Sequence, residues 1–208
     1  MDKSLSRDIL PGKRLHIFDL GNVLYKVDAR RTMDAFEKRG MPRLDGPVSN
    51  SHAAGGVFSL YSDGKVTTAD FIAGVRKACR IPDADDGQIV KAWNSMLLGF
   101  CRESILAVRK VRKQGALVAL LSNCNELHAM ACRSEFRELY PDLGSFDQLF
   151  DHVFFSQEIG MSKPDPGTWQ MVLADMGVSP ADAAFYDDSE INVAEARRQG
   201  VESVLFCL

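Results

Sequence analysis

The chain has 208 residues, a formal net charge of -3 and a hydrophobic share of 46%, values typical of a globular protein that can bury a substantial core. Its charges are mixed and form no basic patch, which argues against nucleic-acid or anionic-membrane partners, and no apolar stretch is long enough to cross a bilayer. The polar leader, residues 1–12, has no apolar signal-peptide core. Five scattered cysteines form no metal or disulfide spacing, so we expect free thiols and a cytoplasmic location.

The first predicted element is a buried strand, because the apolar run from Leu15 to Phe18 leads directly to Asp19. A helix from Ala29 to Arg39, closed by Gly40, is expected next. From there to about residue 100 the pattern is helical, with no convincing strand. A capping box at residues 67–70 opens one helix, and a further helical stripe contains Ile89, Trp93, Met96 and Leu97.

Strands and helices alternate after residue 101. The expected strands are residues 117–121, 152–155, 183–186 and 203–206, with a helix through Ile105 before the first and further helices after Asn125, after Pro164 and up to Gln199. Such alternation predicts an α/β fold with a doubly wound parallel sheet covered by helices on both faces. The helical block before residue 101 then forms an insertion into that fold.

Polar side chains follow three of the predicted strands. Asp19 follows the first, Ser122-Asn123 follows the run ending at Leu121, and Asp187-Asp188 follows the run ending at Tyr186. Parallel sheets bind ligands at the carboxyl ends of their strands. A fourth signal, Lys163, precedes two prolines in a loop. Each motif alone is weak and is more often a turn or a cap, so the prediction depends on their joint occurrence.

In this order and strand context, the four segments resemble the four motifs of the haloacid dehalogenase-like (HAD) hydrolase superfamily. The resemblance covers nearly the whole chain. It implies a Rossmann-like core domain, residues 1–28 and 101–208, and an inserted helical cap domain, residues 29–100. It is strong at the four motifs and weak in the cap.

These residue types suit phosphoryl transfer. A carboxylate such as Asp19 can attack a phosphoryl group and form an aspartyl-phosphate, and Mg²⁺ bridges carboxylates to phosphate. We expect Gly21 to allow a tight turn after the nucleophile. The resemblance implies metal contacts through Asp19, the Gly21 carbonyl and Asp188, with Asp187 acting through water or a hydrogen bond.

The phosphoryl group itself requires donors. Ser122 and Lys163 are expected to stabilise its oxygens as charge redistributes, and Asn123 is included with them as a substrate-binding residue. Lys163 also screens the repulsion between Asp19 and the phosphate, so it is predicted to be a catalytic residue as well.

One position departs from most phosphatases of the superfamily, which carry an acid/base Asp two residues after the nucleophile, where this chain has Gly21. Haloacid dehalogenases also lack that Asp but need no metal, so the pair Asp187-Asp188 favours Mg²⁺-dependent phosphoryl transfer. The strings around Asp19, Ser122 and the acidic pair resemble the branch with bacterial α-D-glucose-1-phosphate phosphatases, which also has glycine there. An anomeric hydroxyl is a better leaving group than an ordinary alcohol, so its ester has less need of a general acid.

The leading prediction is a cytoplasmic Mg²⁺-dependent phosphatase acting on a small phosphorylated metabolite, a sugar phosphate such as glucose 1-phosphate. Three alternatives stay open. They are a phosphomutase or phosphotransferase, a metal-independent haloacid dehalogenase, and a phosphate-binding protein with little turnover because of Gly21. The sequence makes no prediction of the oligomeric state.

Other chemically capable residues are assigned structural roles. Cys124 is expected to be a buried thiol and His16 a core residue, and Trp169 should pack a helix against the sheet. Asp28 is treated as a turn or hinge residue, with replacement of the missing acid as the alternative. His128 is placed on the helix after the second motif, where a role at the pocket mouth is the less favoured possibility.

Overall fold

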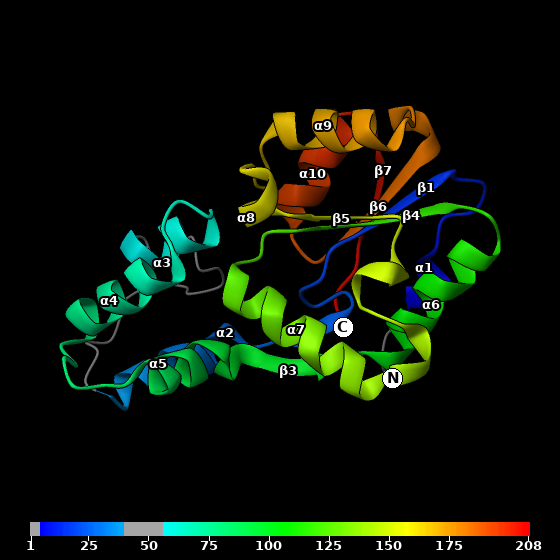
Figure 1. The fold of residues 1–208 in the computed structure, drawn as a ribbon. Coiled ribbons are helices and arrows are strands. Elements are labelled where there is room, and N and C mark those ends of the chain that lie inside the picture. Colours follow the sequence, from blue (N-terminus) through cyan, green and yellow to red (C-terminus); the bar gives the residue numbers. More distant parts are fainter. Residues whose placement is uncertain (1–4, 40–55) are drawn as a thin grey trace.

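The computed structural model describes residues 5–39 and 56–208. Five parallel strands form the central sheet in the order β5-β4-β1-β6-β7 (Figure 1). The first strand of the chain therefore lies in the middle of the sheet, and the predicted doubly wound α/β class is confirmed. The strands are β1 Leu15–Phe18, β4 Leu117–Ser122, β5 His152–Phe155, β6 Ala183–Asp187 and β7 Glu202–Leu205.

Helices cover both faces of the sheet because successive strand residues point to opposite sides. On β1, Ile17 packs in one apolar cluster with Trp169, and Phe18 packs in another with Val108. The first cluster lies under α9 (Pro166–Met176) and α10 (Glu190–Arg198), and the second under α6 (Arg102–Lys113) and α7 (Glu126–Leu139). The short helix α1 (Leu5–Asp8) adds Leu5 to the second cluster.

Four helices between the first strand and the rest pack around a core of their own. These helices, here called the helical group, are α2 (Ala29–Glu37), α3 (Gly56–Ser62), α4 (Thr68–Cys79) and α5 (Asp86–Trp93). The N-cap half of the predicted capping box is present, because the Thr67 side chain accepts a hydrogen bond from the Asp70 backbone N–H at the start of α4. The Asp70 carboxylate accepts from the Thr67 hydroxyl and not from its backbone N–H. The buried side chains of this core are Phe36, Phe58, Tyr61, Phe71, Ile72, Val75, Cys79, Ile89, Ala92 and Trp93.

A two-stranded antiparallel ribbon joins the helical group to the sheet. It pairs β2 (Tyr25–Val27) with β3 (Leu97–Phe100). Because β3 lies within the segment from residue 40 to about residue 100, the expectation of no strand in that segment is wrong. The predicted stripe through Leu97 is also wrong, because α5 ends at Trp93, a 3-10 turn covers Asn94–Met96 and Leu97 begins the strand. The pairing joins segments about seventy residues apart, which local periodicity does not reveal.

The remaining elements differ from the predictions only at their ends. The helix α2 stops at Glu37, and Gly40 lies outside the described residues. The last strand is displaced by one residue toward the N-terminus. The helix α9 ends as expected at Gly177, whose φ of 61° is in the left-handed region that glycine favours. Short elements not predicted are the helices α1 and α8 (Ser156–Ile159) and the 3-10 turns Pro141–Leu143, Asp147–Leu149 and Pro180–Asp182.

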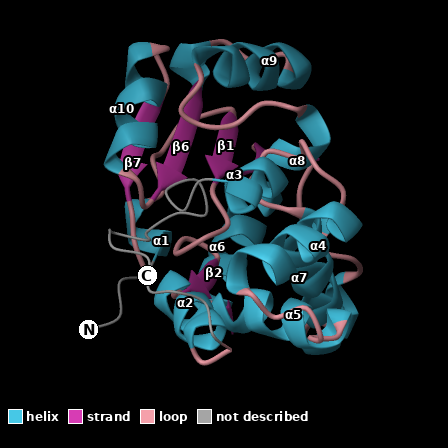
Figure 2. Ribbon diagram, turned by 90° about the vertical axis from the view of Figure 1, so that its left-hand side faces the viewer, coloured by secondary structure: helices cyan, strands magenta, loops and turns pink. Residues whose placement is uncertain are grey.

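The helical group lies against the carboxyl ends of the strands, with α3 in front of the sheet edge (Figure 2). Trp93 donates from Nε1 to Asn125 Oδ1 at 3.2 Å and stacks on His128 at a centroid distance of 5.0 Å. Burial lowers the pKa of His128 to about 4, so a neutral imidazole serves this contact. Among the described residues, no helix has both the length and the apolar character to span a bilayer.

We predict that Phe71→Ala will destabilise the fold by about 3–5 kcal/mol, because it removes a large ring from a close-packed site. Phe71 is 0% exposed and lies 4.2 Å from the Tyr61 ring and 4.9 Å from the Trp93 ring, centroid to centroid. Urea unfolding measures the change. The control is Leu60→Ala, at a position that is 42% exposed and should change stability by less than about 0.5 kcal/mol. Equal effects of the two substitutions would contradict the packing argument.

Candidate active site

The sheet register brings two of the predicted carboxylates side by side. Phe18 pairs with Tyr186, so the next residues, Asp19 and Asp187, leave the ends of β1 and β6 together. The Asp19 backbone N–H donates to the Tyr186 carbonyl at 2.9 Å and extends this pairing by one step. Asp187 is 0% exposed and Asp19 is 8% exposed.

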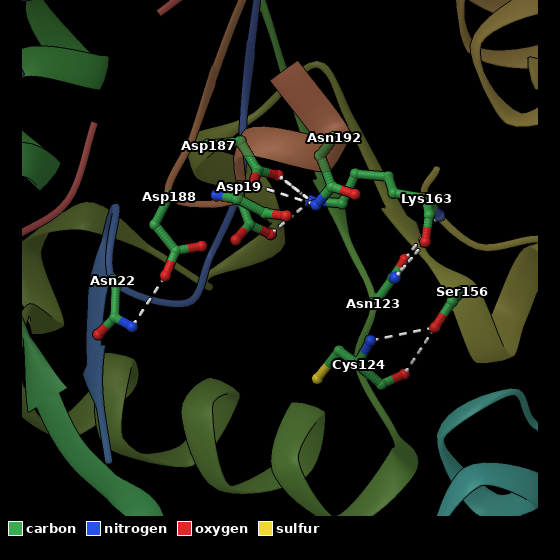
Figure 3. Close-up of polar contacts among 10 residues, drawn as sticks. Asp19, Asn22, Asn123, Cys124, Ser156, Lys163, Asp187, Asp188 and Asn192 are labelled. Carbon is green, nitrogen blue, oxygen red and sulfur yellow. Dashed lines mark hydrogen bonds and ion pairs between the residues drawn. The ribbon is translucent and has the colours of Figure 1, made fainter. Parts of the chain in front are cut away.

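Lys163 links these two carboxylates. Its Nζ lies 2.8 Å from Asp19 Oδ1 and 2.6 Å from Asp187 Oδ2 (Figure 3). The residue is in the loop between α8 and α9, and it is only 4% exposed. Lys163 is therefore placed at the carboxyl ends of the strands, beside Asp19 and Asp187, although it belongs to no strand.

The charges in this cluster perturb one another. Burial alone lowers the pKa of Lys163, but the adjacent Asp187 and Asp19 carboxylates outweigh it and raise the pKa above its ordinary value, so the ammonium persists. Burial raises the pKa of Asp19 to about 7, and the Lys163 charge offsets this rise only in part. Burial also raises the pKa of Asp188, with a further contribution from the Asp187 charge. One ammonium is therefore too little for three carboxylates.

Asp187 has its oxygens occupied by donors. Besides Lys163, it accepts from the Ser189 backbone N–H at 2.8 Å, and Asn192 Nδ2 lies 3.1 Å from each of its oxygens. Such a carboxylate is better suited to orient Lys163 than to bind a cation directly. The sequence interpretation did not include Asn192, whose only signal was its place four residues after Asp188.

Asp188 is held by another side chain that the sequence interpretation did not include. Asn22 donates from Nδ2 to Asp188 Oδ2 at 2.9 Å, and its Oδ1 accepts from the Val27 backbone N–H at 3.1 Å. Asn22 also makes the turn, with a φ of 52°. The positive φ of the turn that follows the nucleophile therefore belongs to Asn22, and Gly21 is not among the positive-φ residues.

The second motif occupies the end of β4. Ser122 is its last residue and is 4% exposed, and its hydroxyl bonds to no other side chain or backbone group in the described part of the chain. The Asn123 side chain instead binds the Lys163 backbone, donating to the carbonyl at 2.7 Å and accepting from the N–H at 2.9 Å. The structure thus places Ser122 at the sheet edge and directs the Asn123 amide to Lys163.

The donor set suits a hard divalent cation. One oxygen from each of Asp19, Asp187 and Asp188 lies within 4.8 Å of the others, and carboxylate oxygens are the ligands that Mg²⁺ prefers. Asp19 and Asp188 are the better candidates for direct contact, because Asp187 is already occupied by Lys163, Ser189 and Asn192. The Gly21 carbonyl stays a predicted ligand.

The residues to which the sequence analysis gave structural roles lie in the core or cap a helix. His16 Nδ1 lies 2.9 Å from the Tyr186 hydroxyl in the core, and the Trp169 ring packs edge-on against Phe185. Burial raises the pKa of the Cys124 thiol well above its usual range, which disfavours a reactive thiolate. The Asp28 carboxylate caps α2 by accepting from the Arg30 N–H at 3.1 Å.

Comparison with known proteins places this site in a family. A model of the haloacid dehalogenase-like hydrolases matches residues 13–200. The chain therefore belongs to this family, and the predicted superfamily and its hydrolytic enzyme class are confirmed. The match covers the helical group and all of the sheet except β7, which begins at Glu202. The glucose-1-phosphate branch stays a prediction.

Individual relatives are similar over nearly the full chain. A D-ribitol-5-phosphate phosphatase from Bacteroides thetaiotaomicron is 27% identical, covering 90% of this chain and 88% of the relative. A HAD-family enzyme from the same species, crystallised with magnesium and inorganic phosphate, is 30% identical with a TM-score of 0.80, covering 93% of each chain. An L-2-haloacid dehalogenase from Xanthobacter autotrophicus, 17% identical with a TM-score of 0.52 over 92% of this chain and 76% of that one, shares the fold alone.

The crowded carboxylates lead to a stability prediction. Lys163→Met should destabilise the protein by about 3–5 kcal/mol, because it leaves buried charges without their partner. Asp19→Asn should instead leave the protein as stable or more stable, because it removes an incompletely compensated buried charge. Thermal or urea unfolding in EDTA compares the two variants. If Asp19→Asn proved the more destabilising, the carboxylate excess would not be the dominant strain in this site.

Proposed function

We propose that this protein is a Mg²⁺-dependent phosphatase that hydrolyses a small phosphate monoester through an aspartyl-phosphate intermediate. The observation that carries the proposal is the Lys163 ammonium, bonded to both Asp19 and Asp187, beside three carboxylates whose oxygens lie within 4.8 Å of one another. The Lys163 ammonium can bind an anionic substrate, and the three carboxylates can bind a divalent cation. Relatives that include phosphatases, and a similar HAD-family enzyme crystallised with magnesium and phosphate, support the same assignment.

Asp19 is the proposed nucleophile. Its Oδ1 accepts from Lys163, which leaves Oδ2 to attack phosphorus. The new oxygen–phosphorus bond forms as the ester bond breaks, and the leaving oxygen takes a proton from solvent or substrate. Water then hydrolyses the acyl phosphate, which returns the carboxylate and releases phosphate.

Lys163 and Ser122 are the proposed phosphoryl ligands. The described residues occupy two of the three Lys163 ammonium donors, through Asp19 and Asp187, so one donor is available for a phosphoryl oxygen. The Ser122 hydroxyl at the end of β4 supplies a second. Donors aimed at charge that redistributes in the transition state lower the barrier without requiring reorganisation.

Mg²⁺ would be held by Asp19 and Asp188, with the Gly21 carbonyl completing the protein ligands and Asp187 acting indirectly. It would offset the negative charge that otherwise separates a phosphate from Asp19. The raised pKa values of Asp19 and Asp188, caused first by burial, support this role because they mark uncompensated carboxylate charge.

The helical group is the proposed cap that selects a small phosphorylated metabolite. It lies against the sheet edge where the charged residues gather. Three classes of substrate compete. The glycine at position 21 favours an anomeric ester such as glucose 1-phosphate, whereas the names of relatives point to a polyol 5-phosphate or a sesquiterpene phosphate. Gly21 also makes phosphotransfer the second candidate, since slow hydrolysis would leave the aspartyl-phosphate to another acceptor.

Asp19→Asn should abolish phosphate release while the protein stays folded, and Asp188→Ala should remove both the Mg²⁺ dependence and most of the activity. The first change removes the nucleophile and the second a charged cation ligand. Steady-state phosphate release is measured against Mg²⁺ concentration, with circular dichroism as the folding control. Undiminished turnover in EDTA would overturn the metal assignment, and release of chloride from 2-chloropropionate would then favour the dehalogenase.

The space at Gly21 permits a direct test of the missing acid. A Cβ built at Gly21 would lie 3.6 Å from Val27 Cγ2 and 3.8 Å from Asp19 Oδ2, both ordinary contacts. We therefore expect Gly21→Asp to fold and to raise kcat/KM for primary esters such as ribitol 5-phosphate by about 10²-fold, the lower end of general acid–base contributions. Aryl phosphates and glucose 1-phosphate should gain less.

Gly21→Ala is the matched control, because it fills the same space without an acid. The measurement is kcat/KM across esters of graded leaving-group pKa. Equal gains for all esters, or a gain with Gly21→Ala, would show that proton donation is not what this position lacks. A wild type insensitive to the leaving group would indicate that another residue already supplies the proton.

A further inference from the structure

We propose that Asn123 is a positioning residue for Lys163 and makes no substrate contact through its side chain. This inference rests on the proposed function, in which Lys163 stabilises the transferring phosphoryl group. Asn123 Nδ2 donates to the Lys163 carbonyl at 2.7 Å, and Asn123 Oδ1 accepts from the Lys163 N–H at 2.9 Å (Figure 3). One side chain thus bonds both backbone polar groups of the lysine, forty residues further along the chain.

The loop around Lys163 has little other support at that residue. Pro164 follows it and has no N–H to donate. The adjoining turn is closed by Asp165 N–H donating to the Ser162 carbonyl at 2.9 Å, and the Thr168 hydroxyl donates to the same carbonyl at 3.2 Å. These bonds fix the ends of the turn, whereas Asn123 fixes the Lys163 peptide groups themselves.

An amide suits this task because it carries a donor and an acceptor in one plane. Its two bonds resemble the pair of N–H···O=C bonds between neighbouring strands. They connect the end of β4 to the loop that contains Lys163. Ser122 is the adjacent residue. A single side chain therefore sets the spacing between the two proposed phosphoryl ligands, one on each side of the link.

The two Asn123 bonds affect catalysis because they fix the Lys163 backbone. The Lys163 ammonium can contact both Asp19 and Asp187 only if its Cα stays in place. A long lysine side chain keeps such a position only when its backbone is held. A displacement of about 1 Å in a positioning group costs up to about 10²-fold in rate. Loss of the two Asn123 bonds should therefore affect kcat more than substrate binding.

The test is a double-mutant cycle on kcat with p-nitrophenyl phosphate and Mg²⁺. Asn123→Ala should lower kcat by about 10- to 100-fold and leave KM within twofold, and it should cost nothing further in a Lys163→Met background. Lys163→Arg, which keeps a buried cation, replaces Lys163→Met if that variant does not fold. Independent, multiplying effects in the cycle would overturn the proposal, as would a raised KM with unchanged kcat.

Two readouts need no turnover. Hydrogen exchange at the Lys163 amide should accelerate in Asn123→Ala, and calorimetric binding of orthovanadate with Mg²⁺ should weaken in wild-type background but not in the Lys163 variant. If the wild-type protein released no phosphate, the proposed function would be rejected. Hydrogen exchange and vanadate binding would still test whether Asn123 positions Lys163. Unchanged exchange or unchanged vanadate binding in Asn123→Ala would reject the link alone.

Gln148→Ala is the matched control for the loss of a side-chain bond that only stabilises a loop. Gln148 also bonds backbone through its side-chain amide, accepting from the Ser145 N–H at 2.8 Å, but it lies in the segment between α7 and β5 and outside the charged cluster. It should lower the melting temperature without lowering kcat. If it lowered kcat as Asn123→Ala does, a general loss of stability would explain both variants and the positioning role would fail.

Discussion

The buried Lys163 ammonium is the constraint on which the rest of the site depends. A cation removed from water costs several kcal/mol unless it is closely paired, and here two carboxylates lie within 2.8 Å of it. The pairing is unequal, however. Asp187 is fully supplied with donors, whereas Asp19 has a single side-chain partner in the described structure. The excess negative charge therefore falls on the sheet edge near Asp19 and Asp188, where a divalent cation would offset it.

The parallel sheet accounts for most of this arrangement without special geometry. Because β1 lies between β4 and β6, the residues that leave these three strands share one edge. Asp19, Ser122 and Asp187 are spread over about a hundred and seventy residues of sequence, yet each needs only to lie at the carboxyl end of its own strand. Lys163 is the exception, since it comes from a loop and requires both the carboxylates and Asn123 to hold it.

This difference explains how much the sequence could predict. The buried runs ending at Asp19, Ser122 and Asp187 are local signals, and they correctly indicated the sheet and its polar edge. The bonds of Asn22 to Asp188 and of Asn123 to Lys163 are long-range hydrogen bonds, and an asparagine in a turn gives no sign of its distant partner. The β2–β3 ribbon was missed for the same reason, because each strand is short and Leu97 continues an apolar helical pattern. Asn192 bonds to Asp187, only five residues away, but its position after the acidic pair was the only signal of that contact.

The support of the second motif also connects the site to the helical group. At the start of α7, the Trp93 indole donates to the Asn125 side chain, and the Tyr61 hydroxyl accepts from the Leu127 N–H. The Ser156 hydroxyl accepts from the Cys124 N–H and lies 3.1 Å from the Ser62 carbonyl of α3. Cys124, Asn125 and Leu127, which receive or make these contacts, all lie within five residues of Ser122. The helices that cover the sheet edge thus rest on the same short segment that presents Ser122 and, through Asn123, Lys163. Repacking of the helical group would therefore alter the placement of both residues, even though neither belongs to it.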